Sequence, residues 1–478
     1  MQRGHSGGEI MKSSPTATTI SDQSGVSETT AASAREARLF ASLDRSAFTK
    51  RHSWLYVVLN LVHLTDGFDI LMVGVVLPGI IATFKLTASQ AGFFASSVFL
   101  GMTVGAVTIT YVADRVGRKK AMLYCVTSYA IFTLIAAFAW SYESIVVLRL
   151  LQGIGLGAEV PLVLTYLLEF VPVRHRGVLA AGTISLWQFA GLLAALVAIL
   201  VIPAFTWRGM FVVAAIPALI FIVAFAYLPE SIRFLVHRDK VDEAEAIVRR
   251  FSSVDPDTVA NSSLVKEVIV ETGLRDILRG RYLPRTLGVW IMSITWAMAF
   301  FGLVAWLPSI LIRMGFTAVH SFAYTAAIVG AGAVGDFLCG WCMDYLGRRR
   351  TTSTCFFLGG ISMIAWGFQT TSSGILLFGM LTAFFGTGGV AGCMFTYICE
   401  LYPTQFRATG SGIATAWQRI GGIIAPSVLG VVIAANGSTF DSFLVLGIIL
   451  LIGGVAAVAL MYETKGKTLE EIAAHLAG

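Results

Sequence analysis

The segments DRVGRKK, residues 114–120, and DYLGRRR, residues 344–350, decide the fold, because one motif occurs twice in the chain. Each segment follows a long apolar stretch. A second motif repeats in the same order: EFVP at 169–172 recurs as ELYP at 400–403. Two different motifs that recur in one order indicate internal duplication rather than chance. The chain is therefore predicted to contain two homologous halves.

The composition places both halves in a membrane. Apolar residues make up 56% of the chain and charged residues 13%, which is too apolar for a soluble protein of this length. A bilayer core about 30 Å thick requires roughly 20 apolar residues per helix. Twelve such stretches begin near Trp54, Ala91, Ala121, Ile145, Val178, Met210, Leu287, Phe322, Ser353, Ile375, Gly410 and Phe443. We expect an all-α membrane protein with twelve transmembrane helices, in two six-helix bundles related by a pseudo-two-fold axis.

Polar segments divide the chain into five parts. Residues 1–50 are rich in Ser, Thr, Ala and Gly and are predicted to be a disordered cytoplasmic tail. Residues 51–228 and 285–464 form the two bundles. Residues 229–284 form a cytoplasmic linker with short amphipathic helices, and residues 465–478 form a second cytoplasmic tail.

Basic residues gather in alternate loops between the predicted helices, which indicates orientation. The positive-inside rule places both termini and the linker in the cytoplasm of a bacterium, with the chain crossing the inner membrane many times. This pattern argues against nucleic acid as a partner. The sequence has no nucleotide-binding glycine loop, metal-ligand cluster or nucleophile arrangement, so no enzyme activity, metal or cofactor is expected. The bilayer is the expected environment, and we expect a monomer.

The repeated loops are candidates for gates. Their carboxylates can pair with arginines across the cytoplasmic face, latch the two halves and release when the halves rock. The alternative is that the basic residues only set topology. Asp336, in the eighth helix, is expected to join this network through Arg348 and Arg349. The expected gating residues are Asp114, Arg118, Glu169 and Arg176 in the first half and Asp336, Asp344, Arg348, Glu400 and Arg407 in the second.

Ionisable side chains inside the predicted helices are functional candidates, because burying a charge in a membrane is costly. The first helix carries His63, Asp66 and Asp69, spaced by three along one face, and the fourth carries Glu159. Carboxylates in low dielectric repel one another, so at least one is expected to hold a proton. We therefore expect Asp66, Asp69 and Glu159 to couple protons to transport. A structural pair neutralised by arginine is the alternative for the aspartates.

Two arginines and several aromatic residues are candidates for substrate contact. The guanidinium groups of Arg149, in the fourth helix, and Arg419, in the eleventh, present a planar fork that matches a carboxylate. A substrate anion, or one of the three membrane carboxylates, is the expected partner of Arg419. Trp296 and Trp417 are suited to stack on a flat ring, although most membrane aromatics pack or anchor interfaces. The remaining candidates are Trp187, Gln188 and Tyr397.

These motifs together resemble the major facilitator superfamily over roughly residues 54–470. PESIRFL at 229–235 and ETKGKTLEE at 463–471 are similar to segments of its sugar porters. DGFD at 66–69, followed by Pro78, resembles a signature in the first helix of the aromatic acid:proton symporter family. That resemblance implies that both Asp66 and Asp69 are needed for transport. Glu159-x-Pro instead resembles the nicotinate and sugar-porter-like transporters.

The leading functional hypothesis is proton-coupled uptake of a small, aromatic carboxylate by alternating access, with the proton gradient as driving force and protons and a small organic anion as partners. Transport of a neutral sugar-like substrate is one alternative, and transport of nicotinate or another organic ion is a second. Efflux of drugs or cations would use the acidic residues, and Arg419 argues against it. A membrane sensor that does not transport is a further alternative, disfavoured by the charges within the helices.

Overall fold

The computed structural model describes residues 35–225, 227–259, 277–278, 280, 282–402, 404–436 and 438–466. Every regular element within these ranges is a helix. The first half contains α2 (Lys50–Leu71), α3 (Val73–Phe84), α4 (Ala88–Val116), α5 (Arg118–Ala136), α6 (Tyr142–Leu156), α7 (Glu159–Phe170) and α8 (Val173–Phe225). Between the halves lie α9 (Ile232–His237), α10 (Val241–Phe251) and η1 (Pro256–Thr258). The second half contains α12 (Tyr282–Arg313), α13 (Ala318–Leu346), α14 (Arg348–Gly367), α15 (Ser372–Thr382), the π-helix η3 (Ala383–Gly389), α16 (Val390–Leu401), α17 (Thr404–Asn436) and α18 (Thr439–Leu460).

The described helices account for the twelve predicted spans. Nine helical segments among the described residues are long and apolar enough to cross a membrane. One of them, Val173–Phe225, contains two spans, because Thr206 breaks the helix with φ 59° and ψ −171°. The other two are α5 and α14, whose basic first turns lower their hydropathy although both pack inside their bundles, on α6 and α18 respectively.

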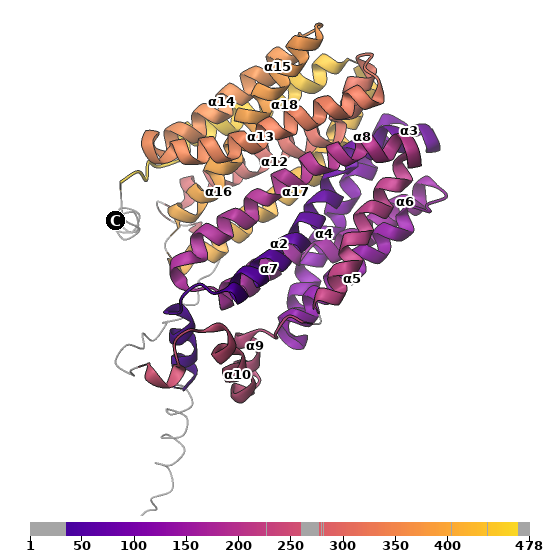
Figure 1. Cartoon of the computed structure of the whole chain (residues 1–478). Helices are drawn as coiled ribbons and strands as arrows, with labels where there is room; N and C mark the ends of the chain where they lie inside the picture. The colour runs from indigo at the N-terminus through magenta and orange to yellow at the C-terminus, as the bar shows by residue number, and fades with distance from the viewer. Residues whose placement is uncertain are drawn as a thin grey trace, which may run out of the picture.

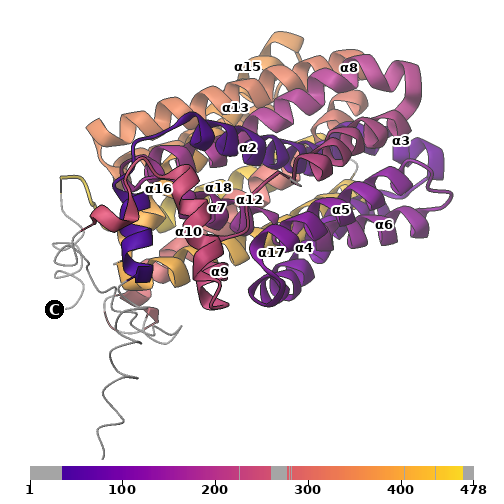
Figure 2. The same cartoon turned by 60° about the horizontal axis from the view of Figure 1, so that its bottom comes forward.

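The two halves lie side by side, and their long helices lie along roughly the same axis (Figure 1). The contacts between them are related in pairs by the duplication: α4 packs on α17, and α13 packs on α8. The linker helices α9 and α10 lie beyond one end of the bundle (Figure 1), and they come in front of the bundle when that end is turned forward (Figure 2). We call this end the basic end, since residues 118–120 and 348–350 begin helices there, and we call the other end the opposite end.

Glycine makes the two repeated loops at the basic end possible. Gly117 and Gly347 have φ angles of 100° and 102°, which only glycine adopts readily. A Cβ at Gly117 would lie 2.8 Å from Glu230 Oε2, and one at Gly347 would lie 2.6 Å from Glu463 Oε2. The duplicated motif therefore gives the same turn, covered by an equivalent glutamate, in each half.

The helix starts at the opposite end repeat as well. A hydroxyl caps each of them by accepting a backbone N–H: Thr87 for α4, Ser141 for α6, Thr317 for α13 and Thr371 for α15.

Close contacts join the halves at this opposite end. A Cβ at Gly74 would lie 2.0 Å from the carbonyl oxygen of Val304, and one at Gly92 would lie 2.5 Å from that of Pro426. The hydroxyls of Ser96 and Ser427 lie 2.9 Å apart. Small residues allow this approach of backbone to backbone, and the two halves meet tightly there.

The prediction of a disordered tail through residue 50 is wrong for its last part. Residues 35–44 form a helix, and Leu39 and Leu43 are only 1% exposed. Arg35 pairs with Asp242 and Glu245 of α10 at 2.6 and 2.7 Å. The helix was not predicted from the apolar residues at 39–43, because the segment before them is polar in composition. Residues 1–34, 260–276 and 467–478 of the predicted tails and linker lie outside the described residues.

Candidate functional site

The site is built on α2, whose polar side chains at a spacing of three face α6 and α7 rather than the membrane. His63, Asp66 and Asp69 are at most 2% exposed. Glycines hold α6 closely against α4: a Cβ at Gly153 would lie 2.2 Å from the carbonyl oxygen of Val98 in α4. Glu159 enters the site because α6 ends at Leu156 and α7 begins at Glu159, which places the carboxylate in the first turn of a helix.

His63, Asp66 and Glu159 form one cluster, which we call the triad. His63 Nδ1 lies 3.3 Å from Glu159 Oε2, and one ligand atom from each of the three residues lies within 4.8 Å of the others. Neither Asp66 oxygen has a hydrogen-bonding partner of ordinary geometry among the described residues, and the same holds for Glu159 Oε1. Two ionised carboxylates buried in this way would be costly. The spacing suits a proton shared between them and is also short enough for a metal ion.

Asp69 belongs to a second cluster with Arg149, Gln152 and Thr133, which we call the arginine cluster. Arg149 Nη1 lies 3.8 Å from Asp69 Oδ1 and donates to Gln152 Oε1 at 3.0 Å. Gln152 Nε2 donates to Asp69 Oδ2 and to Thr133 Oγ1. The structural pair considered for the aspartates therefore describes Asp69, but not Asp66.

Arg149 has no exposed surface in this arrangement, and its guanidinium faces Asp69 and Gln152. Gln152 was not predicted as a site residue. Its signal was present in the sequence, because it lies one helical turn after Arg149 in an otherwise apolar helix.

Arg419 reaches from the second half into the first. Its guanidinium donates to the carbonyl oxygens of Met102 at 3.1 Å and Gly157 at 2.5 Å. Gly157 lies where α6 gives way to α7, and a break of this kind leaves carbonyl groups without intrahelical donors. Asp66 lies near enough for its charge to act on Arg419, although the expected direct pair with a carboxylate is not formed.

Aromatic side chains from both halves meet next to Gly67 of α2, the residue after Asp66. Trp187 of α8 lies against α2, since a Cβ at Gly67 would be 2.8 Å from its Cδ1. Trp187 and Trp296 each meet the ring of Phe301 edge to face, with centroids 5.9 and 6.4 Å apart. Trp296 Nε1 donates to the carbonyl oxygen of Thr387 in the π-helix η3 at 2.8 Å. Phe301 was not predicted, because nothing in its sequence context distinguishes it from other membrane phenylalanines.

The other predicted substrate residues lie elsewhere or take other partners. Tyr397 donates to the carbonyl oxygen of Tyr462, beyond the end of α18, so it lies near the basic end and away from the triad. Trp417 packs on Trp290 with centroids 5.5 Å apart. Gln188 is buried in α8, next to Trp187.

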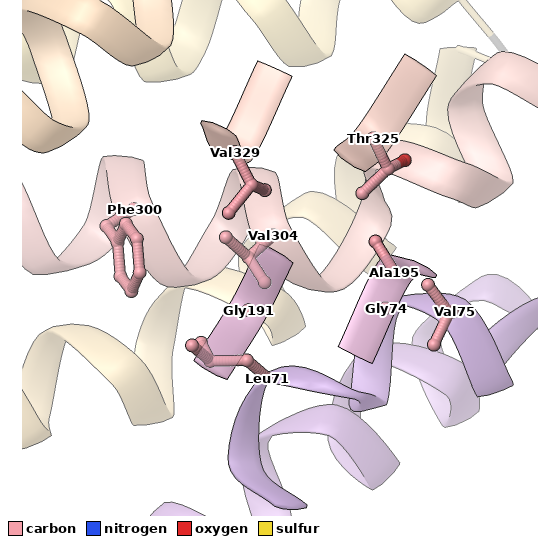
Figure 3. A pocket seen from close by; sticks show the side chains of 9 residues that line it. All are labelled: Leu71, Gly74, Val75, Gly191, Ala195, Phe300, Val304, Thr325 and Val329. Atoms are coloured by element: carbon pink, nitrogen blue, oxygen red, sulfur yellow. The ribbon is translucent and has the colours of Figure 1, made fainter. Parts of the chain in front are cut away.

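A small cavity lies between the halves on the opposite-end side of the triad (Figure 3). Its volume is about 10 Å³, room for about one water. Leu71, Gly191, Phe300 and Val304 line it, and Figure 3 shows their carbon side chains or glycine backbone around it. It is too small for an aromatic ring, so the halves are packed together at this level.

The basic end holds equivalent ion pairs, one in each half. Arg118 pairs with Glu169, and Arg348 pairs with Glu400 at 2.9 Å. Arg348 also pairs with Asp344 at 2.9 Å. The pairs with Glu169 and Glu400 join the repeated loop to the end of the fourth helix of the same half. These pairs lie within one half each, so they do not form the predicted latch across the two halves.

Other predicted gating residues differ in their partners. Arg176 pairs with Asp44 at 2.7 Å, before α2, rather than with Glu169. Among the described residues, Asp336 pairs with neither Arg348 nor Arg349. It lies further from the basic end of α13, where its carboxylate packs against Gly392 of α16. The side chains of Asp114 and Arg407 lie outside those that the structure describes.

Comparison with known proteins identifies the fold and family. Residues 24–476 match the family described as sugar (and other) transporter. The chain belongs to this family of the major facilitator superfamily. It is a multi-pass membrane transporter and not an enzyme.

Individual relatives support this assignment. The niacin transporter NiaP of Acinetobacter baylyi is 31% identical over 436 residues, covering 91% of this chain and 99% of that protein. A gallate transporter of Pseudomonas putida is 29% identical over 390 residues, covering 80% and 86%. An inward-open structure of the xylose transporter XylE from E. coli superposes with a TM-score of 0.72 at 20% identity, covering 89% and 100%. That likeness concerns the fold alone.

Proposed function

We propose that this transporter couples uptake of a small aromatic carboxylate to protons, by alternating access in a bacterial inner membrane, with its basic end in the cytoplasm. The observation that carries the proposal is the separation of the buried charges into two clusters. Asp69 is neutralised by Arg149, whereas Asp66 and Glu159 lie together with no guanidinium bonded to either.

The triad supports proton binding. A single proton shared by Asp66 and Glu159 would leave one negative charge in place of two, which removes most of their repulsion. His63, 3.3 Å from Glu159, can take or pass that proton. Occupancy of the triad by a proton then changes the net charge at the interface between the halves, and with it the cost of closing them around the site.

Arg419 supports recognition of an anion. In this structure its donors are held by two carbonyl oxygens of the first half. A carboxylate would be a stronger acceptor than either carbonyl, because both partners would then be charged. Binding of substrate would therefore transfer Arg419 from backbone to ligand and loosen the contact between α17 and the first half.

The aromatic group supports a flat substrate. Trp187, Trp296 and Phe301 form an edge-to-face group with rings from both halves, and Trp187 lies against Gly67 of α2. The names of several relatives, which include niacin, gallate and benzoate transporters, denote carboxylates on aromatic rings. A ring between these side chains and a carboxylate on Arg419 would use both halves at once.

Uptake into proteoliposomes tests the proposal. The purified protein is assayed with labelled benzoate, nicotinate, an aliphatic acid and xylose, with an imposed pH gradient and with a protonophore. We expect accumulation of an aromatic acid that the protonophore abolishes. Accumulation of xylose alone would establish the neutral-substrate alternative. Uptake that is unaffected by the protonophore but lost on adding a chelator would assign the triad to a metal ion.

A further inference from the structure

A second cavity lies at the basic end of the second half, away from the triad and the arginine cluster. It has a volume of about 500 Å³ and lies between the first turns of α14 and the last turn of α18. Its lining combines charged or polar side chains, Arg349, Arg350, Ser353, Glu463 and Lys465, with the apolar side chains of Leu346 and Val458.

Two of the three cationic side chains of this cavity are bonded to neutral groups. Arg349 donates to the carbonyl oxygen of Val458, and Lys465 donates to that of Tyr345. The one carboxylate, Glu463, accepts the backbone N–H groups of Arg348 at 2.7 Å and Lys465 at 3.1 Å. Three positive charges face one negative charge that is already held by the backbone, so the cavity carries a net positive charge.

Exposed apolar and aromatic side chains at and near this cavity are of the kind expected at the boundary between lipid headgroups and acyl chains. Leu346 and Val458 are 60% and 43% exposed at its rim. On the preceding turns of α13, Trp341 and Tyr345 are also exposed, with ring centroids 4.9 Å apart. Tryptophan and tyrosine are enriched at this boundary in membrane proteins.

We propose that this cavity binds an anionic phospholipid, with the phosphodiester held by Arg349, Arg350 and Lys465 and the acyl chains running along Leu346 and Val458. Basic pockets between helix ends suit such headgroups, because positive charge there meets the negative surface of the leaflet. The proposal is independent of which substrate the transporter carries.

The first half provides a matched comparison. There the equivalent loop is contacted by α9, since Phe234 would lie 3.1 Å from a Cβ at Gly117 and Arg238 donates to the carbonyl oxygen of Arg115 at 2.6 Å. Lys119 and Lys120, at the positions that correspond to Arg349 and Arg350, therefore begin a helix beside protein rather than beside an open cavity.

Native mass spectrometry of the full chain tests the proposal, with dioleoyl phosphatidylglycerol and dioleoyl phosphatidylcholine as competing probes. We expect phosphatidylglycerol to be retained preferentially, and the double variant Arg349→Gln/Arg350→Gln to weaken its binding on the order of tenfold or more. The variant Lys119→Gln/Lys120→Gln, which removes the same charge, is expected to keep the preference. Circular dichroism establishes that both variants are folded.

Other outcomes would overturn the proposal. Equal retention of both lipids, or equal loss in the two double variants, would show that the cavity is not a lipid site. Inorganic phosphate that displaces phosphatidylglycerol at equal concentration would indicate a site for a free anion. The full-length variant Glu470→Gln/Glu471→Gln neutralises two acidic residues near the end of the chain. Retention of phosphatidylglycerol by this variant alone would assign the cavity to that acidic segment. None of these readouts depends on uptake, so they are separate from any failure of the proposed function.

Discussion

Removing Arg149 tests the assignment of Asp69 to a neutralised pair. Arg149 Nη1 and Asp69 Oδ1 are 3.8 Å apart, and both side chains are almost completely buried. In Arg149→Gln, the carboxylate of Asp69 would keep Gln152 as a donor but lose the guanidinium that pairs with it. Breaking a buried pair from one side costs about 3–5 kcal/mol, because a charge is left uncompensated.

The double variant Asp69→Asn/Arg149→Gln removes both charges, and replacing a buried pair with neutral groups is often close to neutral. We therefore expect the double variant to recover most of the stability that either single variant loses, a coupling of roughly 2 kcal/mol or more in a double-mutant cycle. The free energy of unfolding would be measured by reversible titration with dodecyl sulfate in mixed micelles. Penalties that simply add would refute the reasoning. The pair Asp66→Asn with Arg149→Gln is the control, and it should show no such recovery.

Three further outcomes follow from the described contacts. Guanidinium groups of Arg35 and Arg249 hold the pKa of Glu245 below its usual range. The stabilisation that this carboxylate gives to the helix at residues 35–44 is therefore present above the ordinary glutamate pKa and lost as pH falls through the lowered value. Protection of residues 35–44 from hydrogen exchange should fall in that acidic range and not at neutral pH. Gly347→Ala should destabilise the protein by about 1–3 kcal/mol, since φ there is 102°, and an unchanged melting temperature would contradict this. Arg419→Lys should raise KM for the carboxylate at least roughly tenfold, because an ammonium lacks the planar fork, whereas an unchanged KM would remove Arg419 from substrate binding.

Most of the fold could be predicted from the sequence, because it rests on two signals that survive in one dimension. Apolar stretches long enough to span a bilayer mark the helices, and the repeat of residues 114–120 at 344–350 marks the duplication. The helix over residues 35–44 was missed, since its few apolar residues lie within a polar segment. The helix also pairs with a partner that is distant in the sequence, since Arg35 bonds Asp242 and Glu245 of α10.

The charged residues of the candidate site could be predicted from the sequence, but not which of them pair with each other. The spacing of Asp66 and Asp69 puts both on one face of α2, and nothing in that spacing says which of them Arg149 meets. The pairing depends on how α6 is rotated against α2, and the glycines of α6 fix its packing on α4 and α5 rather than on α2. Arg419 was expected to meet a carboxylate, but it bonds the backbone at the break between α6 and α7. The position of that break could not be inferred from hydropathy.

The measurement that most directly tests the central claim compares Asp66→Asn with Asp69→Asn in two transport modes, using the aromatic acid that the uptake panel identifies. One mode is accumulation driven by a pH gradient, and the other is exchange of labelled for unlabelled substrate with no gradient. We predict that Asp66→Asn loses accumulation but retains exchange, because the triad carries the proton, whereas Asp69→Asn loses stability and both modes together. Accumulation by Asp66→Asn at the level of the unmodified protein would contradict the account.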